Sequence, residues 1–226
     1  MRALAALIAD NEAARRASED DAARARLRAW QRARLARTYA DLAALPRYAA
    51  AVAFFLDELY GGVDTAPRNR ELGRAARVLE RLLPGAALLA LKRAIDLEIE
   101  TQRLDAALAA ALPPDAPLTA ATYAEAYRSS APRAAREAQL AAILDLGTTL
   151  DRLVRHRAIA VLVHLAHGPA HAAGVGALHD FLERGFAAFR ATGGAREFLA
   201  VIGERESQLL ARLYAGDPRA LEGISP

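Results

Sequence analysis

Histidines are the residues whose type and spacing most directly suggest chemistry, because four of the five lie between positions 156 and 171. His164 and His167 are three residues apart and so share one face of a helix, and His171 follows after a Gly-Pro break. Imidazole nitrogens bind zinc and other divalent metals and serve as axial ligands to haem, and a carboxylate from a facing helix would complete such a set. His164, His167 and His171 are therefore candidate metal or haem ligands. The alternative is that they are structural histidines, which the absence of an HExxH or ExxH pairing favours.

A further histidine is followed directly by an aspartate, in the pair His179-Asp180. This pair superficially resembles the His-Asp pair of the HD-type metal phosphohydrolases, which are also helical. That family needs an upstream histidine and a distant aspartate at the same metal centre. His156 and Asp217 are the available residues, and Asp217 falls in a predicted tail, so the full set is not in place.

A second candidate site lies around a glycine pair at positions 61 and 62. The glycines lead to a predicted helix start with two arginines, where free backbone N–H groups and guanidinium groups could hold an anion. The alternative is a set of structural ion pairs with the nearby carboxylates, since no phosphate-loop spacing is present. The candidate ligand-binding residues are Asp57, Tyr60, Asp64, Arg68 and Arg70.

The same stretch resembles a group of uncharacterised bacterial helical proteins. The segment that carries the resemblance reads FFL-x-x-LYG over residues 54–61, followed by Asp64 and by the Arg-containing helix start at Arg68. Gly185-Phe186 and the stretch 195–206 are similar to that group as well. The resemblance implies an all-helical fold and transfers no activity.

Six arginines between Arg24 and Arg37 occur without an intervening carboxylate, and Trp30 lies among them. Arginine with an aromatic residue suits nucleic acid, an anionic lipid surface or an acidic partner. The arginines scatter around the helix rather than sharing one face, which favours a solvated helix or a subunit contact over a nucleic-acid surface.

Composition and charge exclude several classes of protein. Thirty basic and 27 acidic residues leave a net charge of +3, so this is not a globally basic nucleic-acid binder. The chain has no cysteine, which excludes disulfides, thiolate metal sites and cysteine nucleophiles. Asp10 and Glu12 follow a short apolar run at once, so we predict no signal peptide or membrane span and expect a cytoplasmic protein.

Helical spacing of apolar residues runs nearly end to end, and no stretch alternates apolar and polar residues. The chain is therefore predicted to be all-α, a single domain of seven or eight helices over 1–215 with a loosely held tail over 216–226. The first 45 residues form a long helical segment, either packed or projecting. Proline and glycine positions place the other helices at about 47–60, 66–83, 85–112, 122–129, 132–167, 170–191 and 195–214.

Two of the predicted helices, 85–112 and 132–167, are apolar on both sides. A helix of this kind must be covered on both sides, so we expect these two to be central and the others to pack around them as a bundle.

The sequence thus favours a non-catalytic binding or regulatory module that takes a protein partner or a small anionic ligand, and that forms a homo-oligomer in one version of this hypothesis. The first alternative is a haem or divalent-metal protein, with or without enzymatic activity, that uses the three clustered histidines. The second is nucleic-acid binding through residues 24–37.

Overall fold

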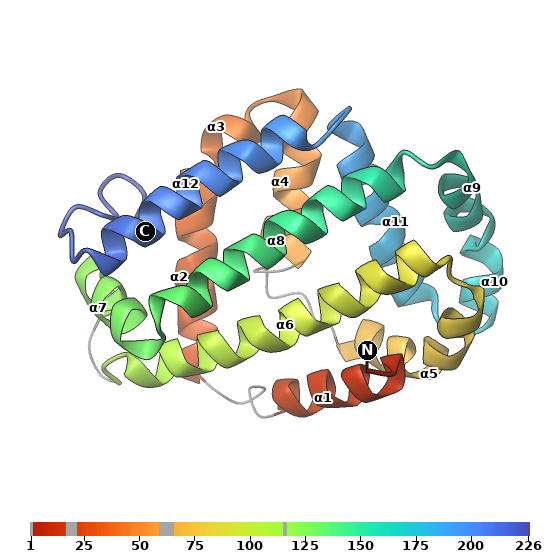
Figure 1. The fold of residues 1–226 in the computed structure, drawn as a ribbon, viewed down its shortest axis with the longest axis horizontal. Coiled ribbons are helices and arrows are strands. Elements are labelled where there is room, and N and C mark those ends of the chain that lie inside the picture. Colours follow the sequence, from red (N-terminus) through yellow and green to blue (C-terminus); the bar gives the residue numbers. More distant parts are fainter. Residues whose placement is uncertain (1, 17–21, 59–65, 115–116) are drawn as a thin grey trace.

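The computed structural model describes residues 2–16, 22–58, 66–114 and 117–226, and within them it is entirely helical, with no strand (Figure 1). The all-α prediction is confirmed. The helices are α1 (Leu4–Arg16), α2 (Ala22–Thr38), α3 (Ala40–Ala43), α4 (Pro46–Glu58), α5 (Ala66–Leu82), α6 (Gly85–Ala111), α7 (Ala120–Ser130), α8 (Arg133–Val154), α9 (Arg157–Leu165), α10 (His167–Ala172), α11 (Gly176–Ala191) and α12 (Arg196–Tyr214).

The predicted number of seven or eight helices is wrong, because the described residues alone form twelve. The predicted helix over 132–167 is divided into α8, α9 and the start of α10. No glycine or proline lies between Gly147 and Gly168, so nothing local marks the break at Arg155 and His156. Tertiary packing decides it: Val154 is buried in the core, and the chain then turns so that α9 packs on α11.

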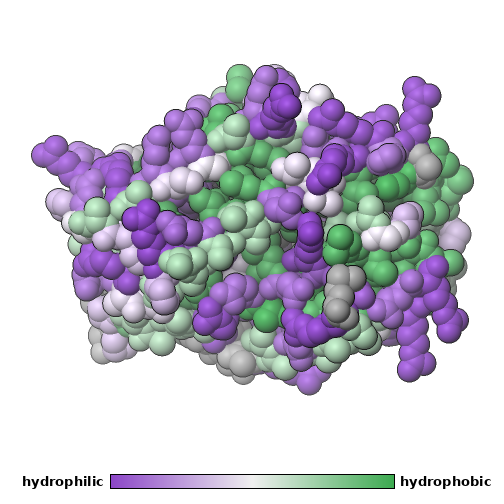
Figure 2. Space-filling model, viewed as in Figure 1, coloured by the Kyte–Doolittle hydropathy of each residue, from purple (hydrophilic) through white to green (hydrophobic). Residues whose placement is uncertain are grey.

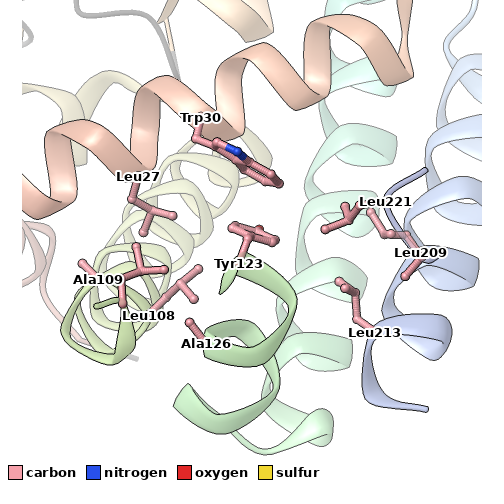
Figure 3. Packing of buried hydrophobic residues seen from close by; sticks show 11 residues of the cluster. Leu27, Trp30, Leu108, Ala109, Tyr123, Ala126, Leu209, Leu213 and Leu221 are labelled. Carbon is pink, nitrogen blue, oxygen red and sulfur yellow. The ribbon is translucent and has the colours of Figure 1, made fainter. Parts of the chain in front are cut away.

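The apolar core consists of three clusters. The first, shown in Figure 3, joins α2, α6, α7 and α12, and in it Trp30 stacks on Tyr123 with ring centroids 4.1 Å apart. The second lies between α4, α8, α11 and α12, where the rings of Phe55, Phe189 and Phe198 meet. The third joins α1, α5, α6 and α11 and consists of Leu4, Leu7, Ile8, Leu72, Ala76, Ile95 and Leu178.

The two helices that were predicted to be central differ in their surroundings. Helix α6 packs against α1, α2, α7 and α8, whereas α8 is exposed along one side. The expectation that both are covered on both sides is therefore wrong for α8. Its exposed side is rich in alanine, whose small side chain costs little in water, and with α6 it borders a hollow of about 450 Å³. The exposed residues of α8 include Ala134, Ala138, Ala141 and Ala142.

The C-terminal residues 216–226 are packed on the molecule rather than loosely held. Ala220 and Leu221 are buried in the first core cluster, against the leucines of α12. Among the described helices, none combines the length and the apolar character that crossing a bilayer requires.

Candidate metal centre

Four side chains from two consecutive helices converge at one end of the molecule. His167 and His171 come from α10, and His179 and Asp180 come from the first turns of α11. One ligand atom from each of the four lies within 4.8 Å of the other three. Neighbouring ligand atoms around a tetrahedral zinc ion lie about 3.3 Å apart, so small side-chain rotations would bring these four to coordination distance.

His179 is the buried member of the group, with 6% of its surface exposed. Its Nε2 lies 2.7 Å from the backbone carbonyl of Val163 in α9, which can only accept, so Nε2 carries the proton. In neutral imidazole the other nitrogen then has a free lone pair. That nitrogen, Nδ1, is buried, has no hydrogen-bond partner among the described residues, and lies 3.6 Å from Asp180 Oδ1, beyond ordinary hydrogen-bond length.

This arrangement is typical of histidines that ligate metals. The nitrogen that does not bind the metal usually donates to a carbonyl or carboxylate, which fixes the tautomer and aims the lone pair of the other nitrogen at the ion. A buried polar atom without a partner otherwise carries a cost of about 1–3 kcal/mol. A cation held beside Nδ1 and Asp180 would satisfy the atom.

His171 approaches the same carboxylate from α10. Its Nε2 lies 2.9 Å from Asp180 Oδ1. The opposite edge of the ring rests on the backbone of Gly176, where an added Cβ would lie 2.5 Å from His171 Nδ1. The ring therefore fits only because residue 176 has no side chain, and Nε2 is the atom directed toward the cluster.

His167 and Glu183 complete the outer edge of the group. His167 Nδ1 lies 4.0 Å from Asp180 Oδ1 and 3.7 Å from Glu183 Oε2, and both side chains are open to solvent. The hydrogen bond from His171 lowers the pKa of Asp180. Asp180 is thus ionised and available as an oxygen ligand.

Short contacts with α5 hold the turn between α10 and α11 in place. The N–H of Leu178, in the first turn of α11, donates to Glu71 Oε2 at 2.8 Å, which satisfies one of the free donors at this helix end. Arg74 donates to the carbonyl of Gly174 at 2.7 Å, and Gly174 has the positive φ of 71° that glycine adopts without strain. The two histidine-bearing helices are therefore anchored to the body of the protein close to the site.

The structure brings together two of the three histidines that the spacing had grouped. His164 is exposed on α9 and is not part of the cluster. Its relation to His167 depended on one continuous helix, but α9 ends at Leu165 and α10 begins at His167. His179 and Asp180 replace it, so the His-Asp pair was the signal for the missing ligands, although its expected companions His156 and Asp217 lie outside the cluster.

The described members of the candidate ligand-binding set do not converge. Asp57 forms an ion pair with Arg32 at 2.8 Å. Arg68 is largely buried, with its guanidinium group 4.1 Å from the ring centre of Phe181 and 3.9 Å from Glu58. Arg70 is exposed on α5, and the remaining two, Tyr60 and Asp64, lie outside the described residues. These contacts fit the ion-pair interpretation of the segment.

The arginine-rich segment 24–37 makes contacts within the protein. Trp30, the aromatic residue that would stack on bases, is buried in the first core cluster (Figure 3). Arg34 forms a partly buried ion pair with Glu206 at 2.6 Å, and Arg26 donates to the carbonyl of Pro113 at 3.0 Å. These contacts fit a helix packed on the body of the protein, with Arg28, Arg32 and Arg37 exposed on its outer side.

The three stretches that carried the family resemblance pack on one another where the structure describes them. Phe54 of the FFL segment lies against Gly185 of α11, where an added Cβ would be 2.8 Å from the ring. Phe55 lies on Phe198 of α12, with ring centroids 6.2 Å apart. The motif therefore defines a packing contact among α4, α11 and α12.

The fold and the cluster define an all-helical protein with a surface-accessible group of three histidines and a carboxylate. The chain belongs to the family described as Domain of unknown function (DUF8198), whose model matches residues 10–220. Comparison with curated proteins and comparison with solved structures find no match.

Proposed function

We propose that this protein binds a divalent transition metal through His167, His171, His179 and Asp180. The observation that carries the proposal is the state of His179. Its Nε2 is fixed by the carbonyl of Val163, and its buried Nδ1, 3.6 Å from Asp180 Oδ1, has no hydrogen-bond partner in the described part of the chain. Desolvating this lone pair is unfavourable unless a cation occupies the space beside it.

The donor set selects the class of metal. Three imidazole nitrogens and one carboxylate oxygen suit Zn²⁺, and also Co²⁺, Ni²⁺ and Cu²⁺, better than Mg²⁺ or Ca²⁺, which prefer oxygen ligands. Four protein ligands fill a tetrahedral shell, which is the pattern of sites that hold a metal rather than catalyse with it. Because His167 and His171 are exposed, the metal would exchange readily with the solution.

Metal binding corresponds to the first alternative drawn from the sequence, a divalent-metal protein, with His179 and Asp180 in place of His164. The hollow between α6 and α8 is not part of the histidine site, because no histidine lines it. Its lining residues are Arg93, Asp96, Leu97, Glu100, Ala135, Ala138, Gln139, Ala142 and Asp145. The histidine cluster itself is open to solvent rather than enclosed. A small ion fits this cluster better than haem does.

Calorimetric titration of the metal-free protein with Zn²⁺ tests the proposal, with Co²⁺ absorption as a second readout. We expect one ion per chain, and loss of binding in His171→Ala and Asp180→Asn. His164→Ala is the matched control, because this histidine lies on the neighbouring helix outside the cluster. Binding that is equal in all the variants, or that disappears with the control, would contradict the assignment.

A further inference from the structure

The end of the molecule that carries α9 exposes aliphatic side chains. Seven large hydrophobic residues are exposed among the described residues, and five of them lie on α9 or on the C-terminal turns of α5. Leu165 on α9 is 68% exposed and Leu82 on α5 is 72% exposed. The others are Val78, Val161 and Leu162.

These two helical segments lie at the same end of the long axis (Figure 1). Figure 2, drawn in the same view, shows hydrophobic residues gathered at that end of the surface. On α9 the three exposed aliphatic residues, Val161, Leu162 and Leu165, share one side of the helix, opposite the side that packs on α8 and α11. Burying that side would remove a contiguous apolar surface from water.

Arginines border this surface. Residues 152–179 contain three arginines and no carboxylate, and one of the three, Arg155, is paired with Asp151. Arg77, Arg81 and Arg157 are exposed and have no carboxylate partner among the described residues. Glu80, the acidic residue nearest to them on α5, is occupied by Lys92 at 3.4 Å and by the N–H of Leu4 at 2.7 Å.

We infer that this end of the protein, formed by α9 and the C-terminal turns of α5, docks on an anionic lipid bilayer surface. Aliphatic side chains surrounded by arginines match the boundary between acyl chains and negatively charged headgroups. Nucleic acid offers no apolar phase for Leu162 and Leu165. Hot spots of protein interfaces are enriched in tryptophan, tyrosine and arginine and poor in leucine and valine, and the exposed apolar residues here are leucine and valine.

Co-sedimentation with vesicles tests the inference, using phosphatidylcholine alone and an equal mixture of phosphatidylcholine and phosphatidylglycerol. We expect the full chain to bind the mixed vesicles and not the neutral ones, with affinity that falls as salt is added. Because each exchange replaces an apolar side chain by a carboxylate that anionic headgroups repel, Leu162→Asp and Leu165→Asp should each lower the partition coefficient about tenfold.

Leu45→Asp is the matched control, since Leu45 is exposed outside this end of the molecule and its exchange should leave binding unchanged. Helix content measured by circular dichroism establishes that each variant is folded. The measurement is made with chelator and with Zn²⁺, because docking does not require the metal. Absence of vesicle binding, equal binding to both kinds of vesicle, or loss of binding in the control alone would overturn the inference. So would self-association of the protein that the two leucine exchanges disrupt, if no vesicle binding is found.

Discussion

The imidazole of His171 packs against Gly176 so closely that a Cβ at position 176 would lie 2.5 Å from Nδ1. Real Cβ atoms do not approach other atoms this closely, so the contact exists only with glycine. It joins the last turns of α10 to the first residue of α11 and directs Nε2 of His171 toward Asp180. The geometry of the cluster thus depends on a residue that contributes no ligand atom.

Gly176→Ala should therefore weaken metal binding while the protein stays folded. The added methyl group pushes the ring of His171 away from Asp180, and loss of ligand positioning of this kind costs about 10- to 100-fold in metal affinity. Zn²⁺ titration measures the effect. Gly168→Ala is the matched control, since Gly168 is also in this region and nothing lies within 4 Å of its added Cβ. Equal affinities in the two variants would contradict the role of Gly176.

Metal affinity should fall in acid because the imidazoles must be neutral to bind. Protons compete with the metal for each imidazole nitrogen, so every histidine ligand adds to the loss of affinity as the pH falls. The lowered pKa of Asp180 keeps its carboxylate ionised through this range, so the aspartate does not limit binding. Zn²⁺ titration of the metal-free protein at several pH values, with measurement of the protons released, checks the pH dependence. An affinity that is constant from pH 8 to about pH 5 would be inconsistent with histidine ligands.

Metal binding should also stabilise α9 and α10 locally. Of the residues in these helices whose side chains are described, none is buried, and His179 links the segment to α11 through the carbonyl of Val163. A ligand at 100 times its dissociation constant stabilises the bound form by about 2.7 kcal/mol, which corresponds to about 100-fold slower exchange through local opening. Hydrogen exchange across residues 156–175 should slow with Zn²⁺, and exchange in α7, far from the cluster, serves as the internal control. Equal slowing in both regions would argue against local stabilisation of α9 and α10 by the metal.

The contact between Phe54 and Gly185 predicts a stability effect that is separate from metal binding. In Gly185→Ala the new Cβ meets the ring of Phe54 at 2.8 Å, and overpacking of this kind costs about 1–3 kcal/mol. Denaturant unfolding should show a lower free energy of unfolding, and Zn²⁺ affinity of the folded protein should be unchanged. Unaltered stability would mean that the two helices separate more easily than their packing suggests.

The fold class can be predicted from the sequence, but the points at which the long helices break cannot. Apolar spacing of 3.6 residues predicts helices, and the described residues are helical. The sequence does not predict the helix break after Val154, because no glycine or proline marks it. The position of the break is determined by burial of Val154 and by the packing of α9 on α11. Alanines on every side of α8 predict a helix that is apolar all round. Burial of an alanine methyl group contributes too little free energy for that side of the helix to have to be buried.

The candidate site could be predicted only in part, because two of its four residues belong to a different helix from the other two. Spacing predicts that His167 and His171 lie together, and in the structure both belong to the same group. Spacing predicts His164 as the third histidine, because it assumes one continuous helix and not a turn between two. His179 reaches the group by a tertiary contact, and its unpartnered Nδ1 becomes visible only when burial is known.

X-ray absorption at the zinc edge of the Zn²⁺-loaded protein tests the central claim most directly. We predict a first shell of three imidazole nitrogens and one oxygen at about 2.0–2.1 Å, with one imidazole lost in His179→Ala. A spectrum with fewer than two imidazoles, or one that His179→Ala leaves unchanged, would contradict the assignment of this cluster as a metal centre.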